Sequence, residues 1–149
     1  MAEPTLPPDF SEFLRLLNAY RVSYLIVGGY AVGFHGHPRA TADIDIWVPR
    51  RADTAQQLMI VLEAFGFDVP QLSTNIFLKP DQVIRMGVPP VRIELLTSID
   101  GVEFDACYAR AVQTTLGDVG VRMIGLDDLK TNKRAAGRHQ DLADLDHLP

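Results

Sequence analysis

The chain has little that would mark it as a secreted or membrane-spanning protein. It contains a single cysteine, Cys107, so no disulfide can form within it, which is typical of a reducing compartment. Its first residues, MAEPTLPPDF, lack the basic and apolar segments of a secretory signal, and no apolar run approaches the length of a membrane span. The sequence therefore predicts a cytoplasmic protein that makes no membrane contact.

Positive charge is also scarce. The chain has 14 Lys and Arg residues against 19 Asp and Glu, a net charge of −5, so any contact with RNA or DNA requires a local basic patch. No repeat, low-complexity segment or linker interrupts the 149 residues, and the 47% of hydrophobic residues suffices for one core. We expect a single domain over residues 1–149.

Hydrophobic periodicity predicts an α+β fold, with a mixed sheet and helices packed on it. The first helix is expected to start with an Asp9 cap and with Glu12 completing a capping box. Further helices are expected over YAVGF, over residues 52–65, and over residues 126–148 with an interruption at Gly137. Strands are expected over SYLIV, DIDIWV, VRIELL and VRMIG, with NIFLK and QVIRM forming a hairpin around Pro80 and Asp81.

Two aspartates alternate with isoleucines in the strand RATADIDIWV, although aspartate is a poor strand former and like charges on one strand repel. Because side chains alternate along a strand, Asp43 and Asp45 share one face, whereas Ile44, Ile46 and Val48 face the core. Carboxylates about 6.6 Å apart along a strand can converge on a divalent cation such as Mg²⁺, which prefers oxygen ligands. The alternative is a solvated polar face that binds no metal.

The segment before these aspartates could bind a phosphate. Gly28 and Gly29 follow a predicted strand and precede a predicted helix, where glycine lets the backbone approach a phosphate and helical N–H groups can bind it. A tight turn is the alternative. Arg39 and Thr41 could add a charge and a hydroxyl to the same phosphate.

Taken together, VGGYAVGFHGHPRATADIDIWV resembles the signature of the DNA polymerase β-like nucleotidyltransferase superfamily. That signature is a strand ending in Gly-Gly or Gly-Ser, a short helix, and Asp-x-Asp on the next strand. The RATADID form is similar to the branch of AbiEii-type abortive-infection toxins and their small relatives. The resemblance extends from about residue 25 to residue 148, and it implies a polymerase β-like nucleotidyltransferase fold.

The resemblance implies further site residues. The segment GVPPVRIELL matches the context of a third acidic residue, with Glu94 where the family usually has Asp; a structural contact between Arg92 and Glu94 is the alternative. The last part of the chain, GLDDLKTNKRAAGRHQDLADLDHL, is similar to the closing helices of the branch. It implies nucleotide contacts from Lys133, Arg138 and Asp141. The alternative is a solvated helix surface that also includes Asp144, with a weak Arg138–Asp141 pair.

The implied function is transfer of a nucleoside monophosphate from an NTP to a hydroxyl of an RNA end, a protein or a small molecule. Asp43, Asp45 and Glu94 would be the catalytic residues and the ligands of two Mg²⁺ ions, or of Mn²⁺ in their place. A toxin role, with an antitoxin protein as partner, is compatible with this activity. The alternative is a nucleotide-binding or protein-interaction module that has the same fold without catalysis.

Four other residues invite a functional interpretation. His35 and His37 form an H-x-H pair, but no further Cys or His lies at zinc-site spacing, so loop histidines are expected. Trp47 shares the aspartate face and is expected to be half-exposed at a sheet edge, with stacking on a base as the alternative. Cys107 lacks the helix start or basic neighbours of a reactive thiolate.

Overall fold

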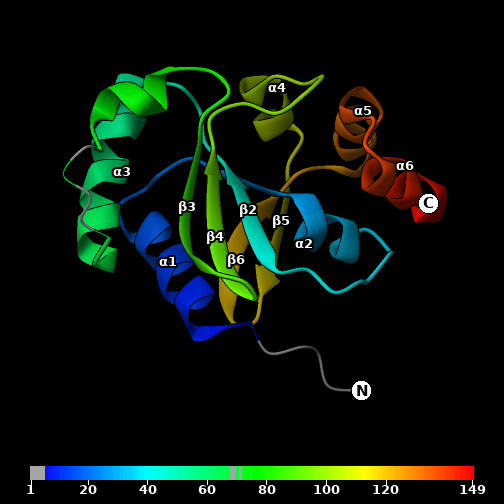
Figure 1. The fold of residues 1–149 in the computed structure, drawn as a ribbon, viewed down its shortest axis with the longest axis horizontal. Helices are drawn as coiled ribbons and strands as arrows, with labels where there is room; N and C mark the ends of the chain where they lie inside the picture. The colour runs from blue at the N-terminus through cyan, green and yellow to red at the C-terminus, as the bar shows by residue number, and fades with distance from the viewer. Residues whose placement is uncertain (1–5, 68–69, 71) are drawn as a thin grey trace.

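The computed structural model describes residues 6–67, 70 and 72–149 as helices packed around one sheet (Figure 1). The helices are α1 (Pro8–Ala19), α2 (Gly28–Phe34), α3 (Ala52–Phe65), the short 3-10 helix η1 (Thr74–Leu78), α4 (Phe104–Ala109), α5 (Leu126–Ala136) and α6 (His139–His147). The strands are β1 (Leu25–Val27), β2 (Asp43–Trp47), β3 (Val83–Val88), β4 (Val91–Leu96), β5 (Val112–Leu116) and β6 (Val119–Met123).

The strands form one mixed sheet in the order β3-β4-β2-β1-β6-β5. At its centre, β2 pairs in parallel with β4 and antiparallel with β1, and β1 pairs in parallel with β6. The antiparallel hairpins β3–β4 and β5–β6 complete the two sides. The predicted α+β class with a mixed sheet is confirmed.

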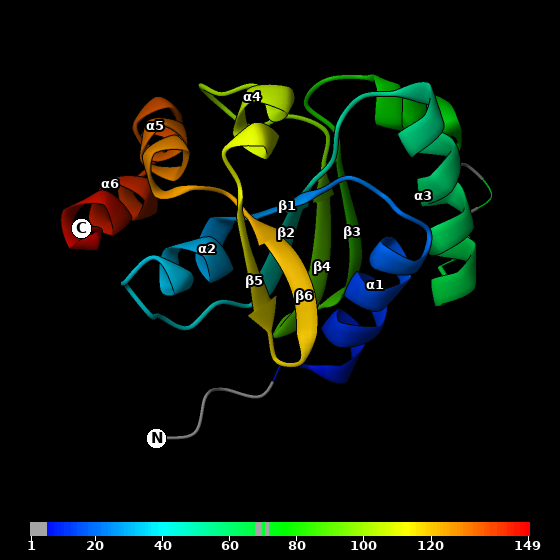
Figure 2. The ribbon, with the colours of Figure 1, turned by 180° about the vertical axis from the view of Figure 1, so that it is seen from behind.

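The helices lie in two groups. In both views of the ribbon, α1 and α3 lie on one side of the sheet, and α2, α5 and α6 lie on the other (Figure 1 and Figure 2). The predicted inward face of β2 is confirmed, because Ile44, Ile46 and Val48 are fully buried in the core. No helix in the described ranges combines the length and the apolar character needed to cross a membrane.

The first helix begins at Pro8 and has no Asp9 cap. Pro7 takes the N-cap position without a side-chain hydrogen bond, and Asp9 falls in the first turn. Proline suits the first helical position because its missing N–H would have no intrahelical partner there. The predicted capping box is therefore wrong. The other helix predictions fare better: α3 has the expected bounds, and Gly137 ends α5 at a φ of +65°.

The middle of the chain departs most from prediction. Residues 74–78 form η1, which packs against α3 and buries Phe77, so the predicted strand over NIFLK is wrong. The hairpin joins β3 to β4 and turns at Pro89 and Pro90, not at Pro80 and Asp81. Helix α4 and strand β5 were not predicted, because each is short and lacks a clear apolar period.

Candidate active site

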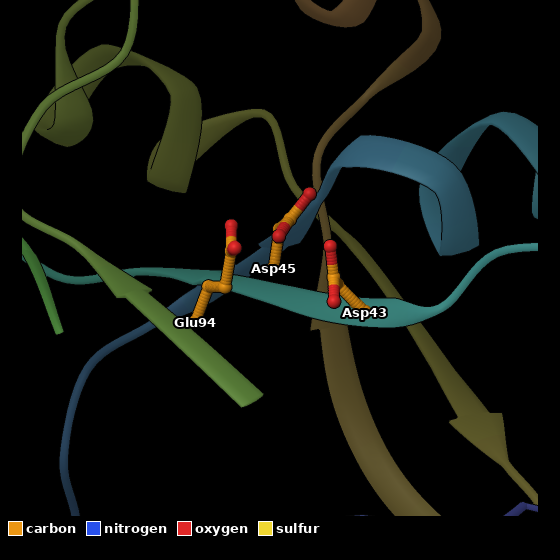
Figure 3. A group of neighbouring side chains, drawn as sticks. All are labelled: Asp43, Asp45 and Glu94. Atoms are coloured by element: carbon orange, nitrogen blue, oxygen red, sulfur yellow. The ribbon is translucent and has the colours of Figure 1, made fainter. Parts of the chain in front are cut away.

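Three carboxylates converge on one face of the sheet. Asp43 and Asp45 come from β2, and the parallel pairing places Glu94 of β4 directly beside Asp45. One oxygen from each side chain lies within 4.8 Å of the other two (Figure 3). We call Asp43, Asp45 and Glu94 the acidic cluster. The structure thus brings together the three residues predicted as metal ligands, whereas Asp100 and Asp105, two acidic residues that follow β4, lie outside the cluster.

Asp45 has the least compensated charge of the three. Its Oδ1 atom is buried and has no hydrogen-bond partner among the described residues. Burial is the largest cause that raises the pKa of Asp45 to about 7, and a hydrogen bond with Glu94 and the charges of Glu94 and Asp43 act in the same direction. An unpartnered buried oxygen among close carboxylates fits a divalent cation, which would supply both the ligand contact and the opposite charge. The acidic cluster could therefore bind a metal.

Two arginines compensate the other members of the acidic cluster. Arg92 donates to both carboxylate oxygens of Asp43, at 2.8 Å from Nε to Oδ1 and 3.1 Å from Nη2 to Oδ2. Its Nη2 atom also lies 3.4 Å from Glu94, and Arg85 Nε donates to Glu94 at 3.0 Å. The predicted Arg92–Glu94 contact therefore exists, but Asp43 is the principal partner. The hydrogen bond to Asp43 raises the pKa of Arg92 above its ordinary value.

Gly28 and Gly29, the first two residues of α2, pack closely on the acidic cluster. Gly28 has a φ of +68°, and a Cβ built there would lie 2.1 Å from Asp45 Oδ2. A Cβ on Gly29 would lie 2.7 Å from Thr41 Oγ1, and Thr41 in turn donates to the carbonyl oxygen of Asp43 at 3.1 Å. The need for glycine thus comes first from contact with the neighbouring side chains. Phosphate binding by Gly28, Gly29 and Thr41 stays a prediction.

A second charged group lies where α5 and α6 meet the loop before β2. Lys133 Nζ is 3.0 Å from Asp141 Oδ1 and 3.0 Å from Asp144 Oδ2. Arg39 binds both oxygens of Asp144, at 2.9 and 3.0 Å, and Arg138 Nε is 2.7 Å from Asp141 Oδ2. We call these five residues the Lys133 cluster. Lys133 and Arg39 were predicted to contact the nucleotide, but in this structure both bind carboxylates.

The aspartates of the Lys133 cluster are well compensated. Asp141 is 1% exposed and Asp144 is 0% exposed, so the alternative of a solvated helix surface is wrong. Burial alone would raise the pKa of each carboxyl group. Hydrogen bonds from Arg138 and Lys133 to Asp141, and from Arg39, Lys133 and Gln140 to Asp144, more than offset burial and lower both pKa values.

The remaining candidates have structural surroundings. Trp47 is 2% exposed and packs edge-on against Phe104 of α4, so its predicted half-exposed sheet edge is wrong; β2 is a central strand, and the unpredicted α4 covers it. His37 stacks on His147, and His35 Nε2 lies 2.6 Å from the carbonyl oxygen of Ile124. Within the described ranges, no group of His and Cys residues that could hold a metal occurs.

Cys107 agrees with its prediction. The side chain is buried, and burial is the largest cause that raises the pKa of its thiol to about 11. A thiol with so high a pKa carries little thiolate at neutral pH, and the thiolate is the reactive form.

Comparison with known proteins bears on the identity of the chain. The family model described as "Nucleotidyl transferase of unknown function (DUF2204)" matches residues 8–149. A search of curated proteins gives no match. The family match supports the nucleotidyltransferase part of the resemblance, and the AbiEii-type branch stays a prediction. Because the match extends over almost the whole chain, the protein belongs to the DUF2204 family of nucleotidyl transferases of unknown function.

Proposed function

We propose that the chain is a metal-dependent nucleotidyltransferase that moves a nucleoside monophosphate from an NTP to a hydroxyl group. The observation that carries the proposal is the acidic cluster, in which a buried Asp45 oxygen has no hydrogen-bond partner among the described residues. Carboxylates held this close cost stability unless a cation offsets their repulsion, and Mg²⁺ or Mn²⁺ is the fitting ion. The description of the family names the same class of reaction.

In the proposed reaction, the acceptor hydroxyl oxygen attacks the α-phosphorus of the NTP, the bond from that phosphorus to the bridging oxygen breaks, and pyrophosphate leaves. Asp43 and Asp45 would hold two divalent cations, which supply stabilisation of the charge on the attacking and leaving oxygens. Glu94 faces the same space from β4 and accepts the proton of the acceptor hydroxyl. Arg92 binds both carboxylate oxygens of Asp43, so a cation at Asp43 would compete with Arg92 for them.

The triphosphate would lie along Gly28 and Gly29, beside Thr41. Lys133 and Arg39 already bind buried carboxylates, so we assign them to fixing α5 and α6 against the loop before β2. Asp141 is the buried partner of Lys133 in this role, and Asp144 is the buried partner of both Lys133 and Arg39. Arg138 differs, because its side chain is 78% exposed and can reach a nucleotide while keeping its bond to Asp141.

The proposed acceptor is a hydroxyl of an RNA end, a protein side chain or a small molecule. The RATADID resemblance supports the finer proposal of a toxin that an antitoxin protein neutralises. Incubation with each α-³²P-labelled NTP, Mg²⁺ and either total RNA or total protein, followed by gel autoradiography, identifies both the nucleotide and the acceptor. We expect one nucleotide to label one class of acceptor, with no labelling when EDTA is added to the reaction before the NTP.

Matched variants test the assignment of residues. Asp45→Asn and Glu94→Gln keep side-chain volume and should lower labelling by ~10²-fold or more, the scale on which positioned acid–base groups act. Asp100→Asn, an exposed carboxylate outside the acidic cluster, should label as the wild type does. Equal labelling by all three variants would show that the acidic cluster is not the catalytic site.

A second candidate is a nucleotide-binding module without catalysis. The observation that favours it is the compensation of Asp43 and Glu94 by Arg92 and Arg85, which reduces the need for a cation. This candidate predicts Mg²⁺-dependent NTP binding in calorimetry with no labelled product from any acceptor. It also predicts that Glu94→Asp, which restores the residue usual in the resembled superfamily, produces no activity.

A further inference from the structure

A pocket lies apart from the acidic cluster. It has a volume of about 400 Å³ and forms where the end of α1 and the loop into β1 meet α4 and the β5–β6 hairpin. None of the residues of the acidic cluster or of the Lys133 cluster lines it. The polar residues of the lining include Arg21, Ser23, Tyr24, Tyr108, Thr114 and Arg122.

The charge of this pocket is opposite to that of the whole chain. Two arginines line it and no acidic residue does, although the protein carries a net charge of −5. Most arginines of the described chain bind a carboxylate within 4.0 Å, whereas Arg21 and Arg122 bind none there. Arg122 instead lies over the ring of Tyr108, with its guanidinium carbon 4.7 Å from the ring centroid. Two guanidinium groups without anionic partners leave a place for an anion.

The backbone at Arg21 makes the arginine harder to explain by folding alone. Arg21 follows the last turn of α1 at a φ of +55°. The N–H of Val22 donates to the carbonyl oxygen of Leu17 at 2.9 Å, and the N–H of Arg21 donates to the carbonyl oxygen of Asn18 at 3.1 Å. These two hydrogen bonds form a Schellman motif at the end of α1. Glycine is the usual residue at this left-handed position, since any side chain there is unfavourable. The chain therefore carries an arginine at a position where glycine is the usual residue.

We propose that this pocket binds a small phosphorylated molecule, with Arg21 and Arg122 holding the phosphate. Arginine offers two parallel donors to a phosphate, and the hydroxyls of Ser23 and Thr114 lie in the same lining. The volume is that of a small-molecule site, which favours a compact ligand over an extended strand of RNA. Tyr24 has a different task, because its hydroxyl already donates to Asn18 at 3.0 Å and fixes the wall of the pocket.

The test titrates the full chain with inorganic phosphate and with AMP as probes, in EDTA so that the acidic cluster holds no divalent cation. Binding is followed by calorimetry and by the amide shifts of Gly120 and Val121, which line the pocket. We expect saturable binding that shifts these amides. Arg122→Gln and Arg21→Gly should each weaken binding by about tenfold or more, because each removes one charge-assisted phosphate contact.

The Arg21→Gly variant distinguishes a role of Arg21 in ligand binding from a role in folding. Arg21→Gly should melt at the same temperature as the wild type or higher, since glycine suits the positive φ, while binding falls. Arg134→Gln is the matched control: Arg134 is an exposed arginine of α5 outside the pocket, and its loss should leave binding unchanged.

Three results would overturn the proposal. One is binding of both probes to Arg21→Gly and Arg122→Gln as tightly as to the wild type. Another is a lower melting temperature of Arg21→Gly, which would make the arginine a structural residue. The third is a wild type that binds single-stranded RNA at these amides but neither phosphate nor AMP, which would assign the pocket to RNA.

Discussion

The acidic cluster and the Lys133 cluster both contain aspartates, but the pKa values of these aspartates are shifted in opposite directions. Each contains two aspartates, which are buried in the Lys133 cluster and half-buried in the acidic cluster. In the Lys133 cluster every aspartate binds two cationic groups, and the pKa values of Asp141 and Asp144 are lowered. In the acidic cluster, Asp45 has no cationic partner, one of its oxygens has no hydrogen-bond partner among the described residues, and its pKa is raised to about 7.

This difference separates a structural use of buried charge from a functional one. Buried carboxylates that are fully paired hold elements together, because separating them would leave charges without partners. A buried carboxylate that stays unpaired lowers stability, and it persists where a ligand supplies what the protein lacks. The Lys133 cluster joins α5 and α6 to the loop before β2, whereas the acidic cluster could hold a cation.

The largest expected effect is on the Lys133 cluster. Lys133→Met removes a 4%-exposed cation and leaves two buried aspartates with fewer partners. We expect the free energy of unfolding to fall by about 3–5 kcal/mol, the scale for breaking a buried pair. Urea unfolding measures the change. Arg134→Met, an exposed position of the same helix, should change stability by less than about 0.5 kcal/mol. A comparably small loss for Lys133→Met would mean that the cluster does not stabilise the fold.

The next effect concerns pH and the acidic cluster in EDTA. The pKa of Asp45 is about 7 in the folded protein, against an ordinary value of 3.8 for an unfolded chain, so the folded state binds more protons between these values. Stability therefore falls as pH rises from about 4 to 7, by roughly 3 kcal/mol. Asp45→Asn has no such proton to lose and should show a flatter profile over this range. Identical profiles for both proteins would mean that Asp45 has an ordinary pKa.

The two clusters should respond to pH in opposite directions. The pKa values of Asp141 and Asp144 are lowered, so their contribution is complete above the unfolded value of 3.8 and is lost as pH falls through the folded values. The loss of stability below about pH 4 should therefore be smaller in Asp144→Asn, which has no carboxylate to protonate at this position. The same variant should leave the slope between pH 4 and 7 unchanged.

The smallest expected effect is on Mg²⁺ affinity, and it tests the role of Arg92. A cation bound by Asp43 competes with the two hydrogen bonds that Arg92 makes to the same carboxylate. Arg92→Gln should therefore raise Mg²⁺ affinity, by about three- to tenfold, or roughly 1 kcal/mol. Calorimetric titration with Mg²⁺ measures it. Arg51→Gln, which removes the ion pair with Asp105 outside the acidic cluster, is the control. Weaker Mg²⁺ binding by Arg92→Gln would mean that Arg92 prepares Asp43 for the metal instead of competing with it.

Much of the site was predictable because its determinants are local. Alternation along β2 predicts that Asp43 and Asp45 share a face, and the family resemblance added Glu94, which the structure brings beside Asp45. The local signals were too weak for α4 and η1. Each of them is six residues or fewer and owes its shape to burial of Phe104 or Phe77 against the rest of the fold. The misplacement of Trp47 at a sheet edge followed from missing α4.

The two-residue period of a strand depends only on local geometry, so it already predicts which carboxylates can act together along β2. Which charge each carboxylate meets depends instead on long-range packing. Arg92 reaches Asp43 across 49 residues, and Arg39 reaches Asp144 across 105. Such pairings follow from the order of strands and the docking of helices, to which residues far apart in the chain contribute together. Asp45 and Asp144 are the same residue type, and their neighbours in the fold make one a candidate ligand and the other a structural anchor.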